Sequence, residues 1–598
     1  AMHGSHSQTE TALPYGSLGA MLPHNTCSVA TVVGMLPSWL EGVVVKNGPG
    51  KTRVGDTKYN HLFDSLAMLH QFSISSGGRV AYRSRFLRSE AFSKNSRANR
   101  IVVGEFGTVA FPDPCKTLFQ RFMNTFIGIP SLENALSDNC LVNVCQATDQ
   151  MFALTETCFL HWVDSQTLQT IGEKVGKMCV LPESLYIYIH GQREGSLTLK
   201  IMIGKYFLVY LRKFYTHTHT QRRTTGCVSL SLSPQEVVTH YVAVNLATAH
   251  PHIDADGTVY NLGTSYTTSL GPQLRIVKFL GGHLEQASIV ASVPSRWKTG
   301  LPYFHSFAMT PNYWVFIEQP LVLFFKNLVL NYVTNNKLMD ALKWMPEEHL
   351  YFHVIERSTG RSVPIKYTAD SLIILHHINA WEEDGHLILD VTANDEGKYL
   401  TTFYFNNIEK EVTDASKVIV TSRIRRFVLP LSLPDETHKN VNLIKLENTR
   451  CSAVRTSKSS VHCTPTVLWN EGFELPRINY KKNGLPYRYV YGVSIGQDLT
   501  FEKLVKLEVN TGRAWLYSEK DCVVTEPIFV AAPDAVDEDD GVILSSLLKG
   551  NDPHYVALLV LDARDLTETA RAEFRAEGHV TIPFHGQYIS AHNLVHSY

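Results

Sequence analysis

Paired cysteine motifs are missing from this sequence. Its 598 residues include 10 cysteines, and none of them forms a CxxC pair. Cys140 and Cys145 are close neighbours, but no second pair completes a four-ligand zinc site. Single, scattered cysteines are typical of a reducing compartment, so the sequence predicts an intracellular, cytosolic protein.

A charge bias and a long apolar run are also absent. The formal net charge is -1, which gives no electrostatic reason to expect a nucleic-acid partner. The most apolar run, 201–211, is interrupted by Lys205 and is shorter than the roughly twenty residues that a spanning helix needs. No basic region followed by an apolar core begins the sequence, so no secretory signal is predicted. Any membrane contact is therefore expected at the surface.

Long helical patterns are few, and short β-rich segments separated by turn residues dominate. Residues 1–35 are polar and weakly patterned and are predicted to be disordered, whereas 36–598 are predicted to form a single domain. Helices are predicted only at 115–126 and 321–344. Many short strands over more than 500 residues favour a β-propeller, because radial repetition scales to this length. No sequence period of WD40 or kelch type is present, so any repeat is structural.

The segment 176–238 differs from its surroundings. It contains the tract Thr216-His217-Thr218-His219-Thr220. His217 and His219 could be read as a metal-binding tract. We interpret the segment instead as an insertion outside the core.

Four histidines share a similar setting in apolar, strand-like segments. Pro251 follows His250 and holds that histidine in an extended backbone, which would aim its imidazole before a metal binds. The others are His305 in YFHSF, His376 in IILHH and His585 in IPFHG. A histidine in such a setting is, taken alone, more often a structural residue than a ligand. A propeller could unite them, because its inner strands converge on one axis.

Metal-bound histidines usually donate their second N–H to a carboxylate or a carbonyl. Three glutamates lie beside apolar residues, where a carboxylate needs a partner: Glu156, Glu474 and Glu526. For each glutamate taken alone, a surface carboxylate at the end of a strand is the more common case. Four neutral imidazoles without a thiolate ligand suit a borderline divalent ion such as Fe(II).

With these residues together, the sequence resembles the animal carotenoid cleavage oxygenases. The similar stretches occur in family order from about residue 36 to the C-terminus, apart from the insertion. They are WLEG, NGPG, KYNHLFDSLAMLH, EFGTVAFPDPCK, TET, ATAHPHIDADGTVYN, HSF, HHINAWEEDG, FELPRINY, EPIFV, EDDGVILS and FHG.

The resemblance implies an all-β, seven-bladed propeller with a few helices and loops capping the face that holds an axial Fe(II). It implies that His250, His305, His376 and His585 bind the iron and that His252 and His377 do not. It also implies that Glu156, Glu474 and Glu526 orient three of the imidazoles, and that Phe106 and Thr155 lie at the substrate tunnel. The expected partners are O2 and a carotenoid or retinoid, with no other cofactor.

Three stretches, YVAVNLATAHPH, FELPRINYKKNGLPYRYVYG and EDDGVILSS, are most similar to family members that cleave the central bond of β-carotene into two retinals. Eccentric cleavage and retinoid isomerohydrolysis use the same scaffold and remain alternatives. A polyene-binding propeller that has lost catalysis is the alternative of a different class.

The segment 111–126 is the candidate for contact with a membrane. Its apolar residues recur at helical spacing and could enter one leaflet beside the tunnel mouth. Cys115 matches a position that the family resemblance connects with lipidation. A core-packed helix with a structural cysteine is the equally weighted alternative.

Overall fold

Seven successive β-sheets dominate the protein. The computed structural model describes residues 26–111, 137–171, 185–192, 196–203, 206–214, 244, 246–265, 271–334, 336–411, 422–434, 441–447, 449–496 and 500–594. Within these ranges all strand pairs but one are antiparallel, the exception being β25 with β30.

The first four sheets follow one another along the chain. The first contains β1 (Thr26–Val29), β3 (Gly42–Lys51), β6 (Leu66–Ser75), β7 (Arg79–Phe86) and β41 (His585–Ser590), and the second β8 (Asn143–Ala147), β9 (Gln150–Leu154) and β10 (Leu160–Val163). The third contains β14 (Leu246–Ala247), β15 (His252–Ile253), β16 (Val259–Ser265), β17 (Gln273–Phe279) and β18 (Ala287–Pro294). The fourth contains β20 (Ala308–Met309), β21 (Tyr313–Glu318), β24 (Leu350–Glu356), β25 (Lys366–Ala369), β29 (Ser452–Ser457) and β30 (Ser460–Thr464).

The last three sheets complete the series. The fifth contains β26 (Ile373–Glu383), β27 (His386–Asn394), β28 (Arg423–Pro430) and β31 (Thr466–Trp469), and the sixth β32 (Glu474–Arg477), β33 (Tyr489–Ile495), β34 (Phe501–Glu508) and β35 (Ala514–Tyr517). The seventh contains β2 (Thr31–Gly34), β36 (Cys522–Val524), β37 (Ile528–Ala531), β38 (Gly541–Lys549), β39 (Asp552–Asp562) and β40 (Glu568–Arg575).

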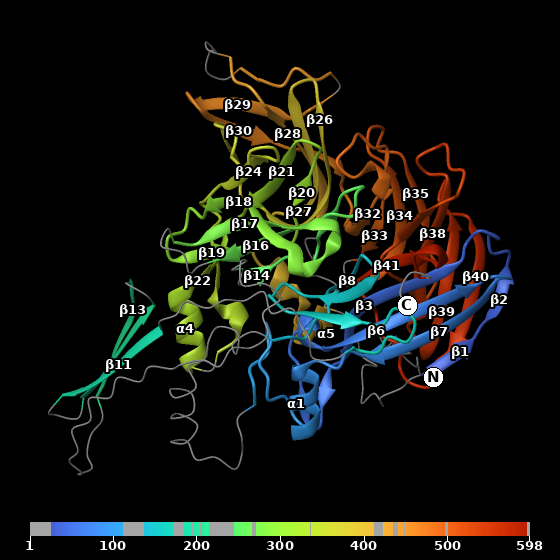
Figure 1. The fold of residues 1–598 in the computed structure, drawn as a ribbon, viewed down its shortest axis with the longest axis horizontal. Helices are drawn as coiled ribbons and strands as arrows, with labels where there is room; N and C mark the ends of the chain where they lie inside the picture. Colours follow the sequence, from blue (N-terminus) through green and yellow to red (C-terminus); the bar gives the residue numbers. More distant parts are fainter. Residues whose placement is uncertain are drawn as a thin grey trace, which may run out of the picture.

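The two ends of the chain close the ring of sheets. β41 pairs with β3, so that His585 lies opposite Asn47, and β2 pairs with β40. Figure 1 accordingly shows the blue first sheet beside the red last strands. This arrangement confirms the predicted all-β propeller and is consistent with seven blades.

Strand formation follows the apolar pattern of each segment. In β7, exposed or partly exposed residues alternate with buried ones along the whole strand, as expected for a strand with one face on the core. β3 is buried over almost its whole length and β39 over seven successive residues, and each strand contributes residues to two hydrophobic clusters.

Helices and short connections lie on one side of the sheets. They include α1 (Glu90–Ala98), α4 (Phe325–Thr334) and α5 (Phe405–Glu411), together with the 3-10 turns η1 (Leu62–Asp64), η4 (Leu338–Ala341) and η5 (Tyr399–Phe403). Figure 1 shows α1, α4 and α5 on the same side of the molecule. Among the described residues, no helix combines the length and apolarity needed to cross a bilayer.

Two expectations about local structure were wrong in part. The ordered part of the chain begins before residue 36, because β1 pairs with β7 and β2 pairs with β40. The Thr and Val residues of β1 and β2 favour strands. The segment 321–344 is not one helix. It forms β22 (Leu321–Phe324), α4, η4 and β23 (Leu342–Trp344), and β22 pairs with both β19 (Gly300–Pro302) and β23.

The insertion contains a small sheet of its own. β11 (Leu185–Gln192), β12 (Ser196–Ile203) and β13 (Tyr206–Phe214) pair only with one another among the described strands. Figure 1 shows this sheet projecting from the side of the molecule near α4. His217, His219 and the predicted helix 115–126 lie outside the described residues.

The cysteines only partly follow the expectation of single thiols. Within the described ranges, five cysteines are free: Cys140, Cys145, Cys451, Cys463 and Cys522. Cys158 is disulfide-bonded, which the scattered spacing of the cysteines did not predict.

Candidate metal centre

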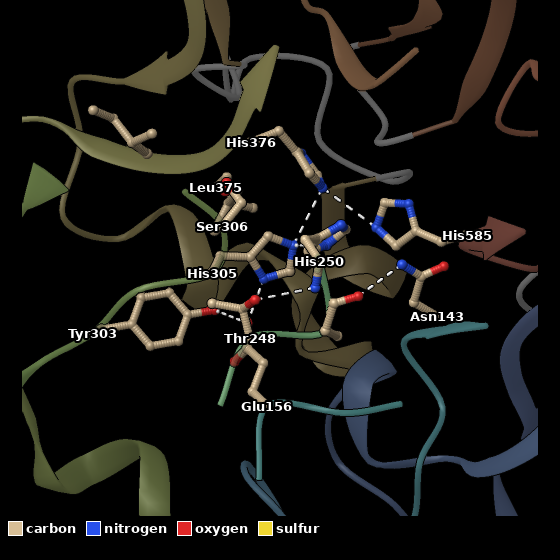
Figure 2. Close-up of polar contacts among 12 residues, drawn as sticks. Asn143, Glu156, Thr248, His250, Tyr303, His305, Ser306, Leu375, His376 and His585 are labelled. Atoms are coloured by element: carbon tan, nitrogen blue, oxygen red, sulfur yellow. Dashed lines mark hydrogen bonds and ion pairs between the residues drawn. The ribbon is translucent and has the colours of Figure 1, made fainter. Parts of the chain in front are cut away.

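Four histidines from four sheets converge on one point. The Nε2 atoms of His250 and His305 lie 2.9 Å apart, those of His305 and His376 3.2 Å, and those of His376 and His585 3.3 Å. One ring nitrogen from each lies within 4.8 Å of those of the others, and the group could hold a metal ion. Figure 2 shows the four imidazoles facing a common centre.

The loop between β14 and β15 fixes the backbone of His250. The His250 N–H donates to Thr248 Oγ1 over 3.2 Å, and the Asn143 amide donates to the Ala249 carbonyl over 2.7 Å. Pro251 follows at once and prevents a helical conformation. The Asp254–Gly257 turn then leads back into β16, as Gly257 N donates to the Asp254 carbonyl.

Irregular strand pairing orients the side chains of His376 and of Glu474, the glutamate that contacts it. The register of β26 against β27 shifts between Ile374 and His377, which marks a bulge at His376. The register of β32 against β33 shifts between Glu474 and Arg477, and Leu475 has a φ of 51°. A left-handed non-glycine residue is strained, so the surrounding sheets must hold it in place.

The backbone also leaves little room next to His585. A Cβ on Gly586 would lie 2.5 Å from the Val45 carbonyl oxygen and 2.6 Å from Lys46 Cγ. Glycine is therefore required for β41 to approach β3 this closely, and this approach brings His585 to the cluster.

A carboxylate holds the outer nitrogen of three of the four imidazoles. Glu156 contacts Nδ1 of His305. Glu474 lies 2.7 Å from Nδ1 of His376, and Glu526 lies 2.7 Å from Nδ1 of His585. Because an ionised carboxylate can only accept, each Nδ1 must carry the hydrogen. The three Nε2 atoms are then left with lone pairs that point at one another.

This arrangement of donors fits a bound cation. Lone pairs about 3 Å apart repel one another, and that spacing is close to that of neighbouring imidazoles bound about 2.1 Å from one ion. Histidine binds a metal as a neutral imidazole, so a low pKa favours binding. Burial, and then repulsion from His585, His305 and His376, holds the pKa of His250 well below its usual range.

The pKa values of the other two buried histidines are also low. Burial lowers the pKa of His376 despite its bond to Glu474, and it lowers the pKa of His585 to about 4 despite Glu526. Both imidazoles are therefore neutral near pH 7 and can offer a nitrogen to a metal.

The carboxylate of Glu526 accepts hydrogen bonds from other groups besides His585. Arg477 donates to both of its oxygens, over 2.8 and 3.0 Å, and Gly586 N donates over 2.8 Å. Burial opposes ionisation, but Arg477 and His585 hold the pKa of Glu526 at about 2. Lys46 donates to the Glu526 carbonyl over 2.6 Å.

Hydroxyl groups hold the other two carboxylates. Tyr303 donates to Glu156 over 2.9 Å, and Tyr399 and Thr392 each donate to Glu474 over 3.1 Å. Sequence reasoning missed Tyr303, Tyr399, Thr392, Arg477 and Lys46. The sequence contains no signal for their roles, although Arg477 lies inside the family-like stretch FELPRINY and Tyr303 lies two residues before His305.

His252 and His377, which closely follow the cluster residues His250 and His376 in the sequence, lie outside the cluster. Nε2 of His252 lies 2.8 Å from the Phe307 carbonyl, to which it donates, and Nδ1 of His377 lies 2.8 Å from the Ser306 hydroxyl. Neither belongs to the group of converging imidazoles.

An apolar cavity of about 220 Å³ reaches the histidine cluster. Phe106 and Thr155 line it, as does Leu475, and His305, His376 and His585 reach its wall. Elements η1, η4, η5 and α5 contribute apolar side chains to the wall, as do the sheets and their connections. These side chains are Leu62, Phe63, Leu141, Val142, Leu246, Leu301, Phe304, Leu323, Leu338, Leu342, Leu375, Phe403, Ile408, Ile495, Phe501 and Phe584. Cys115 lies outside the described residues, whereas Phe111, at the start of the membrane candidate, is 40% exposed.

The four histidines and three glutamates come from all seven sheets. His250 lies between β14 and β15, His305 precedes β20, His376 belongs to β26, and His585 begins β41. Glu156 follows β9, Glu474 begins β32, and Glu526 lies between β36 and β37. Each sheet therefore supplies one residue, as expected if the cluster lies on the axis about which the sheets are arranged.

Comparison with known proteins agrees with this geometry. Residues 22–590 match the family model described as retinal pigment epithelial membrane protein. The chain is 36% identical over 571 residues to the β,β-carotene 15,15′-dioxygenase of Rattus norvegicus, covering 94% of this chain and 88% of the relative. It is 33% identical to the mitochondrial carotenoid-cleaving dioxygenase of Homo sapiens, covering 94% and 88%.

A solved structure has the same fold. The structure of cobalt-substituted apocarotenoid oxygenase from Synechocystis is 20% identical and superposes with a TM-score of 0.67, covering 95% of this chain and 97% of that one. Together with the family match, these similarities lead to one conclusion. The protein belongs to the retinal pigment epithelial membrane protein family, which includes the carotenoid-cleaving oxygenases.

Proposed function

We propose that this protein is an Fe(II)-dependent dioxygenase that cleaves the central double bond of β-carotene with O2 and releases two molecules of retinal. The observation that carries the proposal is the group of four converging imidazoles, three of which reach the wall of an apolar cavity. A conjugated hydrocarbon matches the apolar wall, and nitrogen ligands with open positions match a catalytic metal.

His250, His305, His376 and His585 would hold the iron through Nε2. Neutral nitrogen donors without thiolate suit a borderline divalent ion, and the three carboxylates behind the imidazoles balance its charge. The cobalt-substituted relative supports a metal in this fold. When bound, iron supplies the activation of O2 and of the polyene double bond.

The remaining residues would orient the substrate and exclude water. Glu156, Glu474 and Glu526 fix the three imidazole planes, so their nitrogens need not reorganise during the reaction. Phe106 and Leu475 present apolar surface to the polyene, and Thr155 lies on the same wall. The depth to which the polyene enters the cavity determines which of its double bonds lies nearest the histidine cluster.

Relatives named β,β-carotene 15,15′-dioxygenase support central cleavage, at 35–36% identity. The names of other relatives, carotenoid-cleaving dioxygenases at 33% identity, specify no bond, and eccentric cleavage is our second candidate. Retinoid isomerohydrolysis and polyene binding without catalysis are further alternatives on the same scaffold.

Product analysis distinguishes these functions. Purified, iron-loaded protein is incubated with β-carotene in air, and the products are separated by chromatography. Central cleavage predicts retinal as the sole product, at two molecules per β-carotene consumed. An apocarotenal with a complementary shorter fragment would support eccentric cleavage, and no turnover would support polyene binding alone.

We further propose that the protein is cytosolic and collects its lipophilic substrate from a membrane surface through residues 111–126. The exposed Phe111 at the start of this segment supports such contact. Cosedimentation with liposomes, before and after Cys115→Ser, tests both membrane contact and lipidation. Cell fractionation tests the cytosolic location against the mitochondrial location that the name of one relative states.

A further inference from the structure

Glu105 is a partly buried acid in the wall of the apolar cavity. Its Oε1 accepts a hydrogen bond of 2.7 Å from the Ser137 hydroxyl. That hydroxyl oxygen in turn accepts from Asn139 N over 3.0 Å. Asn139, Ser137 and Glu105 thus form a short chain of hydrogen bonds that ends at Oε1 of Glu105.

Among the residues that the structure describes, none forms a hydrogen bond of this kind with the second carboxyl oxygen of Glu105. Among the described residues, no cation pairs with the carboxyl group, and Ser137 is the one side chain that bonds it. Burial raises the pKa of Glu105 well above its usual range; the Ser137 bond opposes this, and Asp64 and Asp138 add to it. Burial therefore favours the protonated form of Glu105, whose O–H can donate a hydrogen bond.

The neighbouring polar side chains on this wall are already bonded within the protein. Asn139 accepts from Ala67 N over 2.8 Å and donates to the Ser65 carbonyl over 2.9 Å. Thr157 donates to the Ser137 carbonyl over 3.3 Å. Glu105 therefore stands out in this group as an acid with unfilled hydrogen-bonding capacity.

We propose that Glu105 receives a hydroxyl or carbonyl oxygen at the end of a polyene, so that the enzyme accepts oxygen-bearing carotenoids or apocarotenoids in addition to β-carotene and gains affinity for them through this contact. The proposal rests on the proposed function for the polyene class alone. The acid O–H donates to the substrate oxygen, and no bond is made or broken at Glu105. It is a specificity residue.

Selectivity follows from the cost of an unfilled hydrogen bond. A hydrocarbon end at this position leaves the Glu105 O–H buried without an acceptor, whereas an oxygen atom satisfies it. One such bond changes relative affinity by roughly tenfold. Sites built to bond a substrate oxygen discriminate strongly against the analogue that lacks it.

The test compares wild type with Glu105→Leu and Glu105→Gln, two replacements of similar size. Leucine removes all hydrogen bonding, and glutamine keeps a donor. Zeaxanthin and β-carotene are the matched substrates, since they share one carbon skeleton and differ in the ring hydroxyls; β-apo-8′-carotenal supplies a carbonyl. The measured quantity is kcat/KM for each oxygenated substrate relative to β-carotene.

The proposal predicts that Glu105→Leu lowers this ratio about tenfold for zeaxanthin, β-apo-8′-carotenal or both, and that Glu105→Gln restores a large part of it. A ratio unchanged for both substrates in Glu105→Leu would overturn the proposal. A fall that glutamine does not restore at all would show that cavity shape matters instead, and would also overturn it.

Binding without turnover separates this inference from the proposed function. Quenching of tryptophan fluorescence in the absence of O2 gives Kd values for the same polyenes and variants. If the wild type cleaves no polyene but loses about tenfold in selective binding with Glu105→Leu, the proposed function fails and the Glu105 assignment stands. If the wild type cleaves polyenes, but Glu105→Leu changes neither the ratio of kcat/KM values nor the ratio of Kd values, the Glu105 assignment fails and the proposed function stands.

Discussion

At the scale of single residues, the glutamates decide which imidazole nitrogen faces the centre of the cluster. A carboxylate on Nδ1 fixes that atom as the donor and leaves Nε2 for a metal. The sequence indicated Glu156, Glu474 and Glu526 because each lies among apolar residues within a family-like stretch. It gave no indication of Arg477, because an arginine three residues after Glu474 carries no sign that it reaches Glu526.

Glu526→Gln tests this orienting role. The amide accepts more weakly from His585 and loses the ion pair with Arg477, so the affinity for iron should fall roughly 10- to 100-fold. The measurement is iron retained per chain against increasing chelator. Glu382→Gln is the control, since Glu382 bonds Thr310 and Asn312 away from the cluster. Equal chelator midpoints for Glu526→Gln and wild type would contradict the role.

His70 should make stability depend on pH. Burial lowers its pKa to about 3 in the folded protein, compared with about 6.5 in the unfolded chain. Between these values the unfolded chain binds a proton that the folded protein excludes. Stability from this group is therefore complete above about pH 6.5 and declines as the pH falls, by at most about 1.4 kcal/mol per pH unit.

Urea unfolding at about pH 7, 6 and 5 measures this slope. His70→Gln should reduce it, since an amide can replace the contacts to Tyr82 and Thr581 but does not titrate. The exposed His592 provides the control, and His592→Gln should leave the slope unchanged. A wild-type slope retained in His70→Gln would refute the assignment.

At the scale of elements, irregular strand pairing orients the residues of the site. The bulge in β26 turns His376 inward, and the bulge in β32 with the left-handed Leu475 separates the directions of Glu474 and Arg477. Alternation of apolar residues predicted strands in these segments. It could not predict the bulges, because a register shift depends on the neighbouring strand.

The insertion provides a prediction at the same scale. β11, β12 and β13 pair with one another and with no other described strand, and none of the four converging histidines lies in 176–238. Deleting 176–238 should therefore leave iron binding intact. Metal analysis of the deleted and full-length proteins checks this, and loss of iron from a folded deletion protein would show that the segment supports the site.

At the scale of the whole molecule, closure of the ring assembles the site. The residues of the cluster and their carboxylates extend from Glu156 to His585, and each of the seven sheets contributes one. Composition and turn spacing predicted the propeller, and the family-like stretches identified the histidines. The cavity wall could not be predicted in the same way: Glu105 meets Ser137 only through the packing of segments that are distant in sequence.

The central claim is that these four histidines hold one iron ion, and metal content per chain tests it most directly. Wild type, His250→Ala and His252→Ala are purified with iron and analysed by elemental mass spectrometry. The account predicts about one iron per chain in wild type and in folded His252→Ala, and loss of most of the iron in His250→Ala. Full iron occupancy in His250→Ala would contradict the account.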